Sequence, residues 1–449
     1  MNAERISLFS DEPVRKAVLT LAIPTVISQL ITVVYNMADT FFIGKLNDPL
    51  QVAAATIVMP CFMLLTGFAN LFGLGGSSLI SRCLGMADQV KARHCAAFCI
   101  WTGAVAALLY GIAVVLLEPV LFPILGASGD TWEYCRQYAF WTIGVGAVPT
   151  VMNAELAHLI RAEGYSKPAG FGVAFGGILN IILDPIFIFV FHLNIAGAAI
   201  ATMLSNLIAM GYFLGFLYHI RKNTVITPNP KEFSLGHHIP VEVLSVGLPG
   251  FVMTMMSTIS NAALNHMVAG YSDTAIAGMG IAKKIDLLAY AIAQGMTQGT
   301  LPLIGYNYTS GNHKRMKAAI KTAFAYSFLV ACVGAVLLWT LAVPISRCFI
   351  ADTETVSYGQ HFLKIICLAC PTTAVNFMVI TVFQAIGKKI QPLCLSLLRK
   401  GSLDVLFMLI LNSAVGVSGI AWATPFADWI AFVISITLIV PQLRQLKSE

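Results

Sequence analysis

Residues 17–44 read AVLTLAIPTVISQLITVVYNMADTFFIG, and within this stretch only Asp39 carries a charged side chain. About 20 mostly apolar residues are enough for a helix to cross the hydrocarbon core of a bilayer. This run is longer than that, which indicates a tilted or bent helix. Pro24 also interrupts the backbone hydrogen bonding inside it. The stretch therefore predicts a membrane-spanning helix with one acidic residue in its interior.

The rest of the chain repeats this pattern. Of its 449 residues, 57% are hydrophobic and 11% are charged, whereas a soluble domain carries roughly 25% charged residues. So little charge cannot cover the surface of a soluble fold of this size, so the excess apolar residues face lipid. We expect an all-α polytopic membrane protein of twelve transmembrane helices, at residues 17–44, 53–80, 95–117, 137–158, 169–191, 196–219, 241–268, 276–304, 318–343, 359–384, 391–412 and 418–441.

The basic residues indicate how these helices are oriented. Nineteen of the 27 Lys and Arg residues lie in predicted loops on the side of the N-terminus, three lie on the opposite side and five lie within helices. Because basic loops stay in the cytoplasm, both termini are predicted to be cytoplasmic. The net charge of +6 then reflects topology and no nucleic-acid partner. We expect a monomer in the cytoplasmic membrane.

The two halves of the chain resemble each other. Leu21-Ala-Ile-Pro24 matches Val246-Gly-Leu-Pro249, 225 positions later, and Gly197-Ala-Ala-Ile-Ala-Thr202 matches Gly419-Ile-Ala-Trp-Ala-Thr424. Two lobes are therefore predicted, residues 1–225 and 226–449. Since each lobe has six helices, both enter the membrane in the same sense, and a pseudo-twofold axis along the membrane normal relates them. Such repeats are typical of transporters, with the substrate path between the halves.

Four polar residues of the first half are predicted to lie at one depth. Asp39, Asp184 and Thr202 each lie several residues from the outer end of their helix, roughly 8–10 Å below the outer surface at 1.5 Å per residue. Asn180 shares the helix face of Asp184, four residues before it. Ionisable groups inside a membrane are costly and mark function by default, and these oxygens suit H⁺ or Na⁺. The alternative is that both acids only bond one helix to another.

The second half has no equivalent pair of acids. The positions that match Asp39 and Asp184 are Leu264 and approximately Met408. Arg399, Lys283 and Lys284 lie inside predicted helices, and we expect them to pair with Asp286 or Asp404 and neutralise them. Further candidates for lining a cavity are Tyr35, Asn36, Glu155, Asn261, Asn265, Asp286, Gln294 and Asn376. No zinc-ligand set or hydrolase motif accompanies them, so we expect no enzyme and no cofactor beyond a coupling ion.

Several stretches resemble one transporter family. Tyr35-Asn-Met-Ala-Asp39 is similar to its first helix and Leu179-Asn-Ile-Ile-Leu-Asp-Pro-Ile-Phe187 to its fifth, while Phe383-Gln-Ala-Ile-Gly387 and the segment from Trp422 to Asp428 resemble its tenth and twelfth. The family is the multidrug and toxic compound extrusion (MATE) transporters, in particular the bacterial MepA-like and DinF-like branches. The resemblance covers nearly the whole chain.

The resemblance implies a V-shaped pair of lobes and alternating access. It implies export of lipophilic, often cationic drugs in exchange for H⁺ or Na⁺, a route to antibiotic resistance, with Asp39, Asn180, Asp184 and Thr202 as the cation site. Some family members instead use acids in helices 7 and 10, where this chain has Asn261, Asn265 and Asn376. Two alternatives stay open, a lipid-linked oligosaccharide flippase of the wider superfamily and a membrane-embedded enzyme.

Overall fold

The computed structural model describes residues 3–350 and 352–448, and the described part of the chain is helical with no strand. The first half contains α1 (Ala3–Ser10), α2 (Val14–Gly44), α3 (Pro49–Gly85), α4 (Gln89–Ile124), α5 (Gly129–Ala139), α6 (Ala147–Ala162), α7 (Ser166–Pro185) and α8 (Asn194–His219). The second half contains α9 (Ile239–Ala269), α10 (Asp273–Thr309), α11 (His313–Thr340), α12 (Ala342–Phe349), α13 (Thr353–Ile366), α14 (Cys370–Ala385), α15 (Ile390–Ser396), α16 (Leu403–Val415) and α17 (Val417–Ser448).

Short segments of other helix types join several of these helices. The π-helical segments are η1 (Phe140–Val145), η2 (Ile186–Val190) and η5 (Leu397–Ser402), and the 3₁₀ segments are η3 (Pro230–Glu232) and η4 (Cys367–Ala369). π-Helical turns interrupt α-helices and are frequent at functional sites. Two of the three lie at charged residues: η2 begins two residues after Asp184, and η5 contains Arg399.

The twelve predicted crossings are present. Within the described residues, nine helical spans are long and apolar enough to cross a membrane, and α5–η1 with α6 makes a tenth that is bent by 48°. The other two are α10 and the continuous run α15–η5–α16, which are long enough but contain Lys283, Asp286, Arg399 and other polar residues. Charges inside a span are expensive, so both helices place them within the protein.

Observed helices are longer at most ends than the apolar pattern predicts, because polar capping residues start them. The Asp48 side chain accepts a hydrogen bond from the Leu50 N–H at 3.0 Å and caps α3, whose first residue is Pro49. N-capping and an initial proline satisfy or remove N–H groups that would otherwise lack partners. No helix was predicted for residues 1–13, whereas α1 occupies Ala3–Ser10. Helix α1 gives no signal in a search for spans, because it is short and polar.

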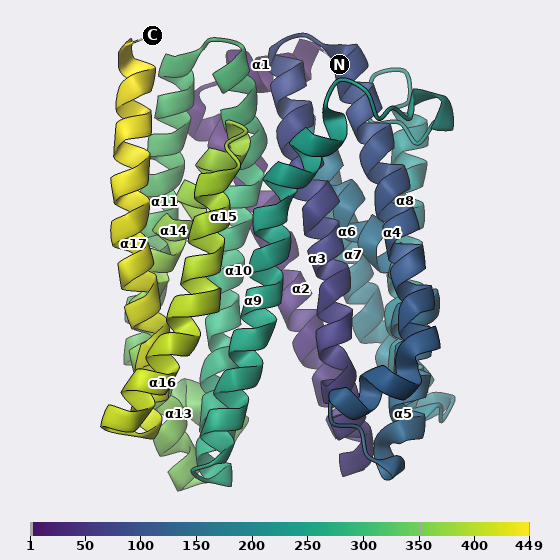
Figure 1. Ribbon diagram of the computed structural model, residues 1–449, viewed down its shortest axis with the longest axis vertical. Helices are drawn as coiled ribbons and strands as arrows, with labels where there is room; N and C mark the ends of the chain where they lie inside the picture. Colours follow the sequence, from purple (N-terminus) through teal and green to yellow (C-terminus); the bar gives the residue numbers. More distant parts are fainter. Residues whose placement is uncertain (1–2, 351, 449) are drawn as a thin grey trace.

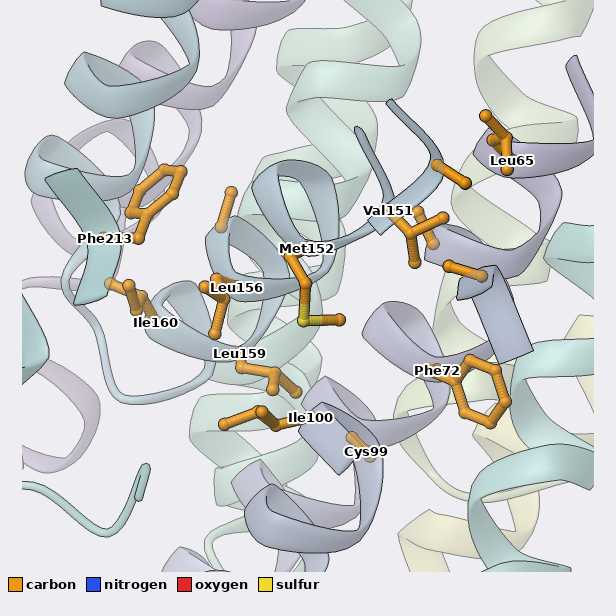
Figure 2. Close-up of a cluster of buried hydrophobic side chains, with 14 of the residues drawn as sticks. Leu65, Phe72, Cys99, Ile100, Val151, Met152, Leu156, Leu159, Ile160 and Phe213 are labelled. Carbon is orange, nitrogen blue, oxygen red and sulfur yellow. The ribbon is translucent and has the colours of Figure 1, made fainter. Parts of the chain in front are cut away.

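The helices form two bundles that lie side by side, α2–α8 and α9–α17, with both chain ends at the same end of the molecule (Figure 1). The first bundle is packed around α3, α4, α6 and α8. Figure 2 shows the middle of this core, where Phe72, Ile100 and Leu156 come from three of these helices. The segment after α8 stays with this bundle, because Glu163 accepts a hydrogen bond from the Val225 N–H at 2.7 Å.

Contacts between the bundles confirm the predicted pseudo-twofold relation. Helix α2 packs against α10, and α3 packs against α9. Since α9 and α10 are the repeats of α2 and α3, exchanging the halves turns one contact into the other. Within the bundles, α7 packs against α8 as α16 packs against α17. A single axis relating the lobes explains both observations.

Glycines allow these helices to approach closely at the interface. A Cβ atom at Gly299 of α10 would lie 2.7 Å from the Ala22 Cα of α2, and one at Gly247 of α9 would overlap the Leu71 carbonyl of α3. Small residues permit such backbone contact in membrane proteins. The two contacts nearly correspond under the repeat, because Gly247 and Ala22 are 225 positions apart and Gly299 and Leu71 are 228 apart, a difference of less than one helical turn.

Polar contacts also join the two lobes, in the region from the middle of the membrane to the side of the chain ends. Glu242 of α9 forms ion pairs with Lys91 at 2.8 Å and with Arg82 at 3.4 Å, both from the first lobe. Arg315 Nε donates to the Phe9 carbonyl at 2.6 Å, so α1 is bonded to the second lobe. Nearer the middle, Gln29 Nε2 donates to Gln298 Oε1 at 2.9 Å. The protein is therefore closed on the side of its chain ends.

We predict that Gly247→Ala destabilises this closed state. The added methyl group overlaps the Leu71 carbonyl, and overpacking costs about 1–3 kcal/mol, which shifts the ratio of closed to open protein by roughly tenfold. Spin labels at the exposed positions Val90 and Ile390, near the chain-end side of each lobe, report the opening by electron–electron double resonance. Gly211→Ala is the matched control, because a Cβ there meets nothing within 4 Å. Identical distance distributions in all three proteins would contradict the prediction.

Candidate functional site

The four predicted cation-site residues come from three helices of the first lobe. Asp39 lies near the end of α2 that is distant from the chain ends, Asn180 and Asp184 lie in the last turns of α7, and Thr202 lies in the early part of α8. A Cβ at Gly177 would lie 2.8 Å from the Tyr35 ring. The absence of a side chain at Gly177 therefore lets α2 approach α7 one turn before Asp39.

Asn180 is hydrogen-bonded to both Asp184 and Thr202, and so links α7 to α8. Its Nδ2 atom donates to Asp184 Oδ1 at 3.1 Å and to Thr202 Oγ1 at 3.3 Å. Asp184 and Asn180 are fully buried. Asp39 is near enough for its charge to act on Asp184, although no hydrogen bond between them is recorded. The sequence argument from depth and helix face thus agrees with the placement of these residues.

Three oxygen atoms at the site have no hydrogen-bond donor among the described residues. They are Asp39 Oδ1, Asn180 Oδ1 and Asp184 Oδ2, all buried. More than nine-tenths of buried polar groups in proteins have a partner, and an unpaired buried acceptor is costly. A proton on a carboxyl group or a hard cation between such oxygens removes this cost. The arrangement therefore has the chemistry of a site for H⁺ or Na⁺.

Other polar groups lie around this site that the sequence argument missed. The Tyr138 hydroxyl of α5 is within electrostatic range of both Asp39 and Asp184. Asn206 donates to the Thr202 carbonyl at 2.9 Å and accepts from Asn153 Nδ2 at 2.8 Å. Asn206 lies four residues after Thr202 on the same helix face, so its position could have been inferred. Tyr138 and Asn153 come from other segments, and no sequence spacing relates them to Asp39.

The other candidate residues of the first lobe lie in two different places. Tyr35 and Asn36 are half-buried next to Asp39 on α2. Glu155 of α6 is fully buried, and neither of its carboxyl oxygens has a hydrogen-bond partner among the described residues. Its carboxyl group contacts Gly103 of α4. Glu155 is therefore packed between α4 and α6, whereas the cation-site residues lie on α2, α7 and α8.

One candidate residue of the second lobe, Gln294, lines a cavity between the lobes. It is lined by Asn70 and Leu74 of α3 and by second-lobe residues that include Gln294 and Phe377. Asn376 is buried, donates to the Asp428 carbonyl at 3.0 Å and accepts from Ser435. Asn261 and Asn265 are exposed on α9, and Asp286 lines a separate cavity inside the second lobe.

The predicted partners are wrong for Arg399 and Asp404, whereas Lys283 lies near enough to Asp286 for the two charges to interact, as predicted. Arg399 pairs with Asp428 on α17, and Lys400 pairs with Asp404 at 3.6 Å. Lys283 bonds to the Thr424 hydroxyl at 3.4 Å. The π-helical turn of η5 changes the direction in which Arg399 points, which a regular helical period does not predict.

The positions that match the two acids of the first lobe are apolar. Leu264 and Met408 are fully buried and belong to one hydrophobic cluster of the second lobe. Their membership of one cluster agrees with the repeat. The structure therefore has a polar site in the first lobe and an apolar core at the equivalent place in the second.

We predict that Asn180→Ala weakens ion binding without unfolding the protein. The substitution removes the unpaired Asn180 Oδ1, an oxygen available to Na⁺, together with the donor that orients Asp184 and Thr202. Losing a group that orients metal ligands typically costs about 10–100-fold in affinity, so the Na⁺ concentration for half-maximal transport should rise at least tenfold. Asn376→Ala is the matched control, an equally buried asparagine of the second lobe. An unchanged half-saturating concentration in Asn180→Ala would contradict this role.

Comparison with known proteins identifies the family. The MatE family model matches residues 24–186 and again 249–410, so its two matches begin at the 225-residue spacing of the repeat. The multidrug export protein MepA of Staphylococcus saprophyticus is 30% identical over 444 residues, which cover 99% of this chain and 97% of that protein. MepA of Staphylococcus haemolyticus is 28% identical, over 98% of this chain and 96% of that protein.

Solved structures share the fold over the full length. One, described as the outward-facing conformation of a multidrug resistance MATE family transporter, has a TM-score of 0.91 at 24% identity, with 100% of each chain covered. A MOP superfamily transporter from Pyrococcus furiosus has a TM-score of 0.89 at 24% identity, with 100% of this chain and 99% of that chain covered. The repeat, the two six-helix lobes and both matches of the family model lead to one conclusion: the chain belongs to the MatE family of membrane transporters and is not an enzyme.

Proposed function

We propose that this protein exports lipophilic, often cationic drugs and toxic compounds across the cytoplasmic membrane in exchange for H⁺ or Na⁺. The observation that carries the proposal is the pair of carboxylates, Asp39 and Asp184, each of which has one buried oxygen without a hydrogen-bond donor among the described residues. Efflux is also the activity in the names of the MepA relatives. The bias of basic residues supports cytoplasmic chain ends.

Helix α2 provides a physical route from the cation site to the lobe interface. Asp39 lies toward one end of α2, and the Pro24 carbonyl, further along the same helix, lies close to Gly170 of α7. Between and beside these points, Ala22 and Val26 pack against Gly299 and Gly295 of α10. A cation that draws α2 and α7 together at Asp39 and Asp184 would bend α2 at Pro24, where a backbone hydrogen bond is missing, and so would change the contact between the lobes.

Alternating access follows from this coupling. In the closed state described here, the Glu242 ion pairs and the glycine contacts hold the lobes together on the side of the chain ends. We propose that cation binding from the outside favours the release of these contacts. The substrate leaves the interlobe cavity outward while these contacts still close the side of the chain ends, and the bound cation enters the cell after they are released. A ligand shifts such an equilibrium only if its affinities for the two states differ. The unpaired oxygens of the site are the groups through which the cation would have different affinities.

Transport into proteoliposomes tests the proposal. Purified full-length protein is reconstituted, and the movement of a cationic dye such as ethidium is followed with a pH gradient or a Na⁺ gradient imposed separately. We expect one of the two gradients to drive dye transport at least tenfold above protein-free liposomes. Dye movement that follows neither gradient would contradict cation coupling. The same assay identifies the coupling ion, because the pH gradient and the Na⁺ gradient are imposed separately.

A lipid-linked oligosaccharide flippase is the second candidate. Such a protein needs a cationic central cavity for its pyrophosphate group, because phosphate recognition depends on Arg and Lys. The interlobe cavity is lined by Asn70, Gln294, Thr297, Gln298 and apolar residues, with no basic residue among those that line it. This lining favours lipophilic substrates.

A further inference from the structure

Helix α1 has no counterpart in the second half of the chain. At the 225-residue spacing of the repeat, the position that matches Phe9 is Ser234, which lies in the linker after η3. Helix α1 is also additional to the two bundles, and it lies at the end of the molecule where both chain ends are found (Figure 1). A helix shorter than about 12 residues is marginal in isolation, so α1 is ordered by the contacts that it makes. These contacts therefore indicate what α1 does.

The second lobe holds the backbone of α1. The Phe9 carbonyl accepts hydrogen bonds from Asn307 Nδ2 at 3.0 Å and from Arg315 Nε at 2.6 Å. Arg315 Nη2 also donates to the Leu8 carbonyl at 3.2 Å. The Phe9 ring stacks on Tyr306, with the ring centroids 5.2 Å apart. The last carbonyl groups of a helix have no partners within the helix, and for α1 the donors come from α10 and α11.

The first lobe holds the side chains of α1. Phe9 is fully buried and Leu8 is 7% exposed. Both lie against the turn between α6 and α7, where a Cβ atom at Gly164 would be 3.2 Å from the Phe9 ring and 3.4 Å from Leu8 Cδ2. Gly164 has a φ of +84°, a conformation that glycine adopts without the steric cost of a side chain. The same glycine therefore forms the turn and leaves room for Phe9.

The equivalent turn of the second lobe is held in a similar way. Gly387, between α14 and α15, matches Gly164 in the repeat and has a φ of +77°. A Cβ atom at Gly387 would lie 2.5 Å from Arg82 Nη1 of α3, and Arg82 forms an ion pair with Glu242. Each turn is thus in contact with a side chain that belongs to, or is bonded to, the other lobe. Both contacts lie where the lobes must separate if this side of the protein opens.

The contacts of α1 are arranged in series. Asn307 and Arg315 join the second lobe to the Phe9 backbone, and the Phe9 ring joins α1 to the first lobe at Gly164. Separation of the lobes has to break one of these two sets of contacts. Residues 11–13 connect α1 to α2, so a released α1 stays attached to the protein and can return.

We propose that α1 is a latch on the cytoplasmic side, formed by Leu8 and Phe9 with their partners, and that it must release before the interlobe cavity opens to the cytoplasm. The proposal rests on the alternating access proposed above and adds a gate to it. The fit of Phe9 at Gly164 then determines what fraction of the protein is open to substrate from inside the cell. It also gives a role to a helix that the repeat does not require.

Replacing Phe9 with Ala tests the latch. Spin labels at Val90 and Ile390 report the ratio of open to closed protein in the purified full-length transporter, without an ion gradient or a dye. The substitution removes most of the apolar surface that Phe9 buries, so we expect this ratio to rise about tenfold or more. Phe122→Ala is the matched control, because Phe122 is equally buried near the opposite end of α4. It should destabilise the fold and leave the ratio within about twofold of the wild type.

The serial arrangement predicts a second result. Arg315→Gln removes two donors to α1 and should also raise the ratio of open to closed protein. The double variant with Phe9→Ala should exceed the larger single effect by no more than about twofold, because one broken link already releases the latch. Single effects that multiply in the double variant would mean two independent contacts and would overturn the proposal. An unchanged ratio in Phe9→Ala would overturn it as well.

Hydrogen exchange supplies a measurement that leaves α1 itself unaltered. In Gly247→Ala, which is expected to open the same side, the peptide that contains Phe9 should exchange its amide hydrogens about tenfold faster than in the wild type. In Gly211→Ala it should exchange as in the wild type. If this peptide stays protected in any variant whose spin labels report opening, the lobes separate without releasing α1, and the latch is excluded.

These measurements separate the latch from the export function. A failed latch leaves gradient-driven dye export intact in proteoliposomes, with Phe9→Ala and the wild type closed to the same extent. A failed export function would instead abolish dye transport by the wild type, while Phe9→Ala still shifts the spin-label distances.

Discussion

Replacing Asp184 with Asn reduces gradient-driven dye export at least a hundredfold, and Asp39→Asn has the same effect. Each substitution keeps the size of the side chain but removes a carboxylate that holds the coupling ion. The loss is large because Asp184 is fully buried with an unpaired oxygen, and the coupling ion needs both of the carboxylates that the site provides. In the second lobe the equivalent positions are Leu264 and Met408.

The measurement separates coupling from binding. Dye transport in proteoliposomes is compared with dye affinity in detergent, which should change by less than threefold in both variants. Asp130→Asn is the control, since Asp130 is exposed at the start of α5, and it should transport as the wild type does. Transport above half of the wild-type rate in both Asp39→Asn and Asp184→Asn would exclude these acids as the coupling site.

The second large effect concerns stability. Arg399→Gln should lower the free energy of unfolding by about 3–5 kcal/mol, the usual cost of removing one partner from a buried ion pair. Asp428 is 1% exposed and would keep its bond to Thr373 and the more distant charge of Lys400 as compensation. The unfolding transition of the purified protein in mixed micelles measures the change.

The double variant identifies the cause. When Asp428→Asn accompanies Arg399→Gln, the uncompensated charge is absent, and most of the lost stability should return. Lys16→Gln is a useful comparison, because Lys16 pairs with Glu12 on the surface and exposed pairs contribute little. If the double variant is as unstable as Arg399→Gln alone, packing of the guanidinium group on Phe377 matters more than the charge pair.

Much of the fold could be predicted because it depends on properties that are local in sequence. Apolar runs such as 17–44 exceed the bilayer thickness wherever they occur. The repeat of Leu21–Pro24 at Val246–Pro249 required two similar lobes. Helix α1 was missed because its eight residues carry no signal of this kind. It is held by tertiary contacts such as that between Phe9 and Arg315.

The cation site was predictable to a similar degree. Asp184 and Asn180 share a helix face, and depth alone grouped them with Asp39 and Thr202. Tyr138 could not be predicted from the sequence, because its position depends on how α5 packs against α3 and α8. The pairing of Arg399 with Asp428 was also out of reach. It depends on the π-helical turn in η5 and on the rotation of α17, which only tertiary packing determines.

The central claim is that the coupling cation binds in the first lobe. Dicyclohexylcarbodiimide, which modifies protonated carboxyl groups in apolar surroundings, locates such sites when the modified peptides are identified by mass spectrometry. We expect modification of Asp39 or Asp184, and this modification should decrease when Na⁺ is added or when the pH is raised. Addition of the substrate should also change its extent. Modification confined to Asp286 or other second-lobe acids, or modification of Asp39 and Asp184 that responds to neither ion nor substrate, would contradict the claim.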